Sequence, residues 1–184
     1  IYNFSYKKKF SRIKPIKPYS IKNNYKQILD TFFKVTTNQK KLAETLKDED
    51  WLNWRLIESP FNKNIFFFEY KDNFAIANIF YKGNIKRVNI LYTYYLNNLY
   101  TEDLFKSIIS WALNNKVDLI WANSNDQQLI NKFENLFSNK FSKSLNFACY
   151  SSDSRFYNTL KLGLNNIQAI DSDNDINCLN DNSL

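Results

Sequence analysis

The chain has 184 residues, of which 44% are hydrophobic and 23% are charged, and this excludes a disordered chain and a membrane-spanning protein. It contains no histidine and only two cysteines, which excludes a Ser-His-Asp triad, a Cys-His pair and an HExxH zinc site. It also lacks methionine, so we interpret it as a piece of a longer protein, and we expect a reducing, cytoplasmic compartment.

The net charge of +7 is unevenly distributed. Residues 1–47 hold twelve Lys or Arg against two acids, whereas residues 48–170 are nearly balanced. A basic arm beside a neutral body is typical of proteins that bind nucleic acid or another polyanion. The dominance of Lys, Asn, Ile, Tyr and Phe is also the bias of an AT-rich genome, and no aromatic RNA-binding motif accompanies the arm, so we expect nucleic acid not to be a partner.

The first predicted elements precede the sheet. Residues 1–20 are basic and contain two of the three prolines, which predicts a linker or an edge strand. Apolar residues at helical spacing predict a helix over residues 25–33, ending near Thr36. A second helix is expected over 51–57, with Asp48 as its N-cap. The apolar face of this helix would contain Trp51, Leu52, Trp54 and Leu56.

Three strands are predicted next, over residues 65–70, 74–81 and 87–95, because these runs are aromatic and β-branched. The segments between them, 71–73 and 82–84, have the composition of turns. The three strands therefore form an antiparallel meander.

A crossover follows the meander. We expect Thr101 to cap a helix that runs to Leu113, a buried strand over 117–122, and a helix that opens at Asp126. Two last strands are predicted at 145–150 and 167–170. A meander followed by a βαβ crossover predicts an α/β fold with a mixed, mainly antiparallel sheet and helices on both faces.

Two stretches carry a resemblance to a known family. Residues 47–55, Lys-Asp-Glu-Asp-Trp-Leu-Asn-Trp-Arg, are followed closely by Ser59-Pro60, and residues 170–175 read Ile-Asp-Ser-Asp-Asn-Asp. Together with the element order, they resemble the C-terminal half of tandem proteins of the GNAT acyltransferase superfamily that occur with bacterial surface-polysaccharide synthesis. The resemblance implies a GNAT-like fold and transfer of an acyl group from acetyl-CoA or another acyl-CoA to an amine, often on a sugar.

The resemblance also divides the chain. It implies a GNAT-like domain over residues 21–175 and a disordered polar tail over residues 176–184. Residues 1–20 are then a basic linker or the end of a preceding domain.

In the GNAT fold, the pyrophosphate of CoA lies where the fourth strand turns into a helix, held by backbone N–H groups of a Gly-rich turn. Here that turn is residues 97–101, and Asn98 and Thr101 are the cofactor-binding candidates. The turn has no glycine, Arg or Lys, and Glu102 and Asp103 would place two carboxylates in the first helical turn, facing the pyrophosphate. We therefore expect a degenerate half that supports the acceptor site, with acyl-CoA bound by an N-terminal GNAT half of the same parent chain.

The candidate catalytic residues lie on the meander. Glu69 is flanked by aromatics, where burial would raise its pKa, and is the candidate general base for the acceptor amine. Tyr92 and Tyr94 are candidates to protonate the leaving thiolate, because the corresponding GNAT strand faces the acyl group. Trp54 and Arg55 are candidates to bind the acceptor. Each has a structural alternative: the aromatic residues would pack in the core, and Arg55 would pair with an acid.

Two other interpretations were weighed. Asp171, Asp173 and Asp175 have the spacing of an EF-hand loop, but Ile176 replaces its glycine and Asn182 its last glutamate, so no metal site is expected. The rival function is a non-enzymatic module whose basic N-terminal arm binds a polyanion.

Overall fold

The computed structural model describes residues 2–3, 16–36, 47–60, 62–122, 124, 126–136 and 139–140. Within this part of the chain, seven strands form one sheet in the order β2-β3-β4-β5-β6-β1-β7. The strands predicted at 145–150 and 167–170 lie outside the described residues, as do residues 4–15 and 37–46 of the basic arm and the acidic C-terminal tail.

The predicted meander is confirmed. The strands β3 (Ile65–Tyr70), β4 (Asn73–Lys82) and β5 (Ile85–Tyr94) pair antiparallel in sequence order. The two connections are tight, and each contains one residue with left-handed backbone, Lys71 in the first and Gly83 in the second. The strands therefore form where aromatic and β-branched residues run between turn residues.

The predicted crossover is also confirmed. From β5 the chain passes through α3 (Asn98–Asn114) to β6 (Leu119–Ala122), which pairs parallel to β5. The short strand β1 (Tyr2–Asn3) pairs antiparallel to both β6 and β7 (Asn139–Lys140), and β2 (Tyr19–Ser20) pairs with β3 at the far edge. The edge-strand interpretation is thus confirmed for β2. The sheet is mixed and mainly antiparallel, as predicted.

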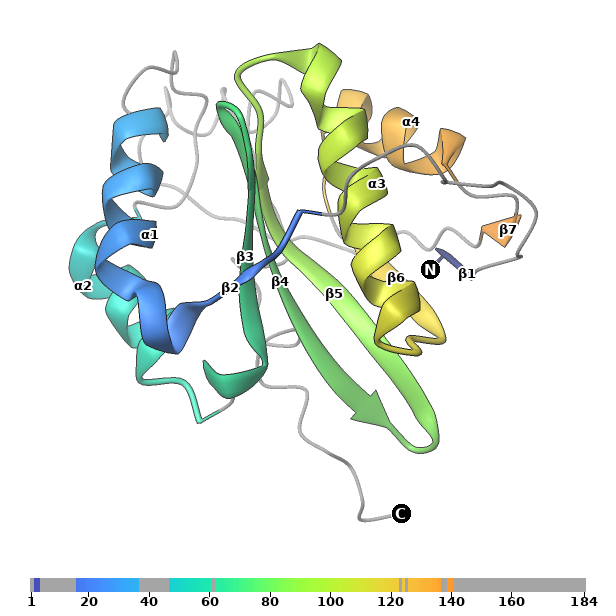
Figure 1. Cartoon of the computed structure of the whole chain (residues 1–184), viewed down its shortest axis with the longest axis horizontal. Helices are drawn as coiled ribbons and strands as arrows, with labels where there is room; N and C mark the ends of the chain where they lie inside the picture. The colour runs from blue at the N-terminus through green and yellow to red at the C-terminus, as the bar shows by residue number, and fades with distance from the viewer. Residues whose placement is uncertain are drawn as a thin grey trace, which may run out of the picture.

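Helices cover both faces of the sheet (Figure 1). One face packs against α1 (Ile21–Thr36), α2 (Glu49–Leu52) and its continuation as a π-helix, η1 (Asn53–Ile57). We call this the α1 face. The opposite face packs against α3 and α4 (Gln127–Asn135), and a 3-10 turn, η2 (Asn62–Asn64), leads into β3. No helix in the described ranges combines the length and apolarity needed to cross a bilayer.

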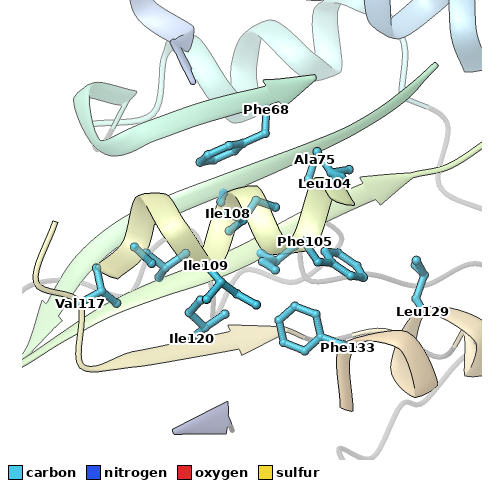
Figure 2. Close-up of a cluster of buried hydrophobic side chains, with 14 residues drawn as sticks. Phe68, Ala75, Leu104, Phe105, Ile108, Ile109, Val117, Ile120, Leu129 and Phe133 are labelled. Atoms are coloured by element: carbon cyan, nitrogen blue, oxygen red, sulfur yellow. The ribbon is translucent and has the colours of Figure 1, made fainter. Parts of the chain in front are cut away.

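Each face has its own apolar core, and the two cores are separated by the sheet. Figure 2 shows the one opposite the α1 face, where side chains of α3 and α4 meet those of the central strands. Its largest members pair Phe105 of α3 with Phe133 of α4, whose ring centroids are 4.9 Å apart. The α1-face core contains Ile21, Ile28, Leu29, Phe32, Leu52, Leu56, Ile65, Phe67, Phe74, Ile76, Leu91, Tyr92 and Tyr94.

A β-bulge in β5 changes which side chains face each core. Ile76 pairs with Tyr92 but the next residue, Ala77, pairs with Ile90, so Leu91 has no partner in the register. Leu91 and Tyr92 consequently both join the α1-face core, although they are adjacent. Without the bulge, strict alternation would send one of them to the other face.

The start of α3 differs from the prediction. Asn97, not Thr101, is the N-cap: its backbone is extended and its side chain accepts from the Leu99 N–H. Thr101 lies inside the helix and is 0% exposed. Because the helix starts at Asn98, its first turn contains no acid, and the expectation that Glu102 and Asp103 stand there is wrong.

The second helix also differs in part. Asp48 is its N-cap, as predicted, and Leu52 and Leu56 are buried. Trp54, however, is 54% exposed and does not belong to the apolar face. At about 100° per residue, a side chain two positions from Leu52 and from Leu56 points to the opposite side of the helix.

Candidate functional site

Glu69 and Tyr94 lie in one cross-strand row of the α1 face, but Phe74 stands between them. Glu69 pairs with Phe74, and Phe74 pairs with Tyr94. With about 4.8 Å between neighbouring strands, the backbones of Glu69 and Tyr94 are about 10 Å apart. The Phe74 ring stacks on Tyr94 with 5.4 Å between centroids and 11° between planes. The row is therefore aromatic packing with a carboxylate at its edge.

Tyr92 and Tyr94 are packed into the core, with exposed fractions of 1% and 2%. The ring centroid of Tyr92 is 5.6 Å from that of Phe32 on α1 and 5.9 Å from that of Phe74. The Lys47 ammonium, itself buried, is 5.3 Å from the Tyr92 centroid. The rings of both tyrosines are therefore part of the α1-face core.

Glu69 is half-buried and has the property predicted for it. Burial raises the pKa of its carboxyl above the ordinary 4.5, Lys34 lowers it and Asp72 raises it further. Burial is the largest of these effects, because removing water penalises the charged form. Glu69 is thus the candidate that combines partial access with a raised affinity for a proton.

Trp54 and Arg55 are adjacent, but only the first is accessible. The Arg55 guanidinium carbon is 5.5 Å from the Trp54 ring centroid, in cation–π geometry, and Arg55 is buried. Both belong to the π-helix η1, whose wider turn is closed by the Glu58 N–H donating to the Asn53 carbonyl at 3.0 Å. Such π turns occur frequently at functional sites. The pair presents an exposed indole backed by a cation.

The turn from β5 into α3 is fastened by Asn73, the first residue of β4. Asn73 is 0% exposed. Its Oδ1 accepts from the backbone N–H groups of Leu96, at 3.0 Å, and Asn97, at 3.2 Å. Its Nδ2 donates to the Asn97 carbonyl at 2.8 Å. One buried amide thus holds both sides of the turn.

The next amides of this turn are also occupied. The Leu99 N–H donates to Asn97 Oδ1 at 2.9 Å, and the Tyr100 N–H donates to the Asn97 carbonyl at 3.2 Å. The Thr101 hydroxyl donates to that carbonyl at 3.4 Å, while the side chain of Asn98 is outside the described part of the structure. A pyrophosphate cradle needs backbone N–H groups that point to the ligand. Four N–H groups of this turn, those of Leu96, Asn97, Leu99 and Tyr100, already donate within the protein.

The parallel strand β6 ends before β5 does. Their pairing stops at Ile90 and Ala122, whereas β5 continues to Tyr94. Beyond this point, the Tyr95 hydroxyl donates to Asp126 Oδ2 at 2.7 Å. Burial, together with this bond, raises the pKa of the Tyr95 hydroxyl. The hydrogen bond links the residue after β5 to the N-cap of α4.

Sequence reasoning missed the roles of Asn73 and Tyr95. It placed Asn73 in a turn by composition, and its partners, Leu96 and Asn97, are more than twenty residues away. Asp126 was correctly predicted as a helix N-cap, but nothing in the sequence pairs its second oxygen with Tyr95. Both are long-range contacts, which a one-dimensional pattern does not contain.

No protein-family model and no curated protein matches the chain. Two crystal structures of TTHA1254 from Thermus thermophilus, a single-residue mutant and the wild type, are similar to it in structure. The mutant has 13% identity and a TM-score of 0.48, covering 77% of this chain and 99% of that chain. The wild type has 14% identity and a TM-score of 0.44, covering 78% and 99%. Neither likeness supports an assignment of family or function.

Proposed function

We propose that this chain is a GNAT-like acyltransferase domain that supports the acceptor side of a sugar or amine N-acyltransferase and does not hold acyl-CoA at its own strand-to-helix turn. The observation that carries the proposal is that four N–H groups of the turn between β5 and α3 already donate within the protein. Asn73 and Asn97 accept the hydrogen bonds that a diphosphate would need. The donor, acetyl-CoA or another acyl-CoA, is then held by an N-terminal GNAT half of the same parent chain.

The element order supports the GNAT-like part of the proposal. A meander, a helical crossover and a parallel strand are the features on which the sequence resemblance was based, together with the segment that holds Trp54 and Arg55. The strand β5, which continues to Tyr94 beyond its last pair with β6, corresponds to the strand that faces the acyl group in GNAT enzymes.

The acceptor-side assignment is supported by two groups. The exposed Trp54 ring, backed by the Arg55 cation, offers a flat surface on which a sugar ring can stack. Glu69 offers a proton acceptor whose pKa is raised toward the range useful for amine chemistry. Tyr92 and Tyr94 contribute to packing in this proposal, because their side chains are buried.

Calorimetric titration of acetyl-CoA into the chain tests the donor part. We expect no saturable heat for the natural chain. A second titration uses Asn73→Ala, which removes the acceptor of the Leu96 and Asn97 N–H groups. It measures whether the turn binds acetyl-CoA once these two N–H groups have lost their acceptor. Saturable binding of acetyl-CoA by the natural chain that weakens when Asn98 or Thr101 is replaced would overturn the proposal.

A fluorescence titration with glucosamine tests the acceptor part. We expect saturable quenching that is lost in Trp54→Ala and retained in Tyr81→Ala, a matched control at another exposed aromatic residue. Equal quenching in the natural chain and in Trp54→Ala would contradict the assignment of Trp54. Heparin affinity that falls steeply with salt, with no glucosamine binding, would favour the rival polyanion-binding module.

A further inference from the structure

One half of the α1 face, which we call the polar half, carries polar side chains beside Phe80 and Leu119, and none of these side chains belongs to either apolar core. Val88 of β5 and Ile120 of β6 pair with each other and both belong to the opposite core. Because successive side chains alternate, Arg87, Asn89 and Trp121 must project from the α1 face. The polar half is therefore built from adjacent residues of two parallel strands.

Two hydrogen-bond donors in this half lack an acceptor within the described part of the chain. The Arg87 Nε and Trp121 Nε1 atoms are buried, and neither has a hydrogen-bond partner among the residues that the structure describes. The acid closest to Arg87 along the paired strand, Asp118, accepts instead from the Lys86 backbone N–H at 2.8 Å. A buried donor without an acceptor destabilises the folded chain, because it has lost its hydrogen bond to water, so such groups are rare in folded proteins.

The positions of the two donors indicate a shared acceptor. Arg87 pairs with Leu119 and Asn89 pairs with Trp121, which makes Arg87 and Trp121 diagonal neighbours on one face. Strand spacing and rise put their backbones about 8 Å apart, within reach of one small group between two long side chains. Guanidinium and indole nitrogens only donate, and the guanidinium is always charged. An anion rich in acceptor atoms would satisfy both donors and would also balance the charge of the guanidinium.

We propose that Arg87 and Trp121 form a binding site for an oxyanion, the phosphate or carboxylate group of a small-molecule ligand. The planar guanidinium suits either group, because both present paired oxygens at hydrogen-bonding distance. The Trp121 indole N–H adds a second donor from the next strand. This site is separate from the β5–α3 turn, and the proposal stands on the sheet alone, whether or not the chain takes part in acyl transfer.

The test is a titration followed by NMR at the indole N–H signals of the four tryptophans. Inorganic phosphate, sulfate and acetate are added separately at constant ionic strength, so that phosphate-type and carboxylate-type ligands are distinguished. We expect a saturable shift of the Trp121 signal, assigned with Trp121→Phe, and no saturable shift of the Trp54 signal. We also expect the bound anion to raise the midpoint of thermal unfolding, because it binds only the folded chain.

Variants separate a built site from general attraction to a basic protein. Arg87→Gln should abolish the shift, whereas Lys82→Gln, which removes the same charge from the exposed tip of the β4–β5 hairpin, should retain it. Trp121→Phe keeps most of the ring and should weaken anion-dependent thermal stabilisation at least threefold in apparent affinity, which provides a readout even if Arg87→Gln does not fold. The proposal is overturned if no anion shifts the Trp121 signal, or if both charge variants lose the effect equally.

Discussion

The two halves of the α1 face differ in how they use their side chains. In the aromatic half, Tyr92 and Tyr94 pack against Phe74 and have no access to solvent. In the polar half, Arg87 and Trp121 carry buried donors that have no partner in the described structure. Tyr92 and Tyr94 were predicted as catalytic residues from their residue type, but their side chains are packed in the apolar core. A group whose chemistry the fold leaves unsatisfied is the better guide to a site.

The largest expected effect lies in the aromatic half. Phe74 contacts four rings, those of Phe32, Phe67, Tyr92 and Tyr94. Phe74→Ala should destabilise the chain by about 3–5 kcal/mol, because it removes a buried ring and leaves a cavity. Urea unfolding measures this change, and Tyr81→Ala at the exposed hairpin serves as the control. A loss below about 1 kcal/mol would mean that the aromatic half is not a packed core.

A smaller loss is expected where the aromatic half meets the β5–α3 turn. Asn73→Ala removes four hydrogen bonds and leaves the Leu96 and Asn97 N–H groups without their acceptor. The expected destabilisation is about 2–3 kcal/mol, with faster hydrogen exchange at those two amides. Asn84→Ala in the exposed β4–β5 turn should cost less than about 0.5 kcal/mol. Equal losses in the two variants would contradict the fastening role of Asn73.

Much of the fold follows from local pattern. The strand β3 matches its predicted bounds, and Asp48 and Asp126 cap helices as expected, because capping and alternation depend on neighbours in sequence. The predicted start of α3 was wrong because two nearby residues are able to cap a helix. Asn97 and Thr101 can both cap a helix, and Asn73, from another strand, fixes the earlier start.

Less of the candidate site than of the fold could be predicted from the sequence. The partial burial of Glu69 was predictable from its aromatic neighbours. The burial of Tyr92 beside Leu91 was not, because it depends on a bulge in the register. The sequence also could not predict that Arg87 Nε and Trp121 Nε1 lack a partner in the described structure, because hydrogen-bond partners depend on the three-dimensional surroundings.

In the polar half, the effect on stability should be small and dependent on anions. Arg87→Met keeps the length of the side chain and removes a buried donor that has no partner in the described structure. Without added anion, its stability should lie within about 1 kcal/mol of the natural chain, because the unpaired Nε–H is removed together with its cost. Phosphate should stabilise the natural chain and not the variant. If Arg87→Met lost as much stability as Phe74→Ala, the two halves of the α1 face would not differ in the way proposed.

The smallest effect concerns Glu69, at the edge of the aromatic row. Because burial raises its pKa in the folded chain above the ordinary 4.5, the folded chain binds this proton more tightly than the unfolded chain does. This contribution to stability is present below pH 4.5 and is lost as the pH rises through the raised pKa. Glu69→Gln should therefore gain stability relative to the natural chain across that window, measured as urea midpoints at several pH values. If the natural chain instead became more stable than Glu69→Gln as the pH rises, the pKa of Glu69 would be lowered in the folded chain.

The proposed function requires that the β5–α3 turn does not bind acyl-CoA. Four N–H groups of this turn already donate within the protein. An acetyl-CoA titration read at the amide signals of Leu96, Asn97, Leu99 and Tyr100 tests it directly. We expect that these signals do not move and that the Leu96 and Asn97 amides exchange slowly with solvent, with or without acetyl-CoA. Saturable shifts of the same four signals at micromolar acetyl-CoA would contradict it.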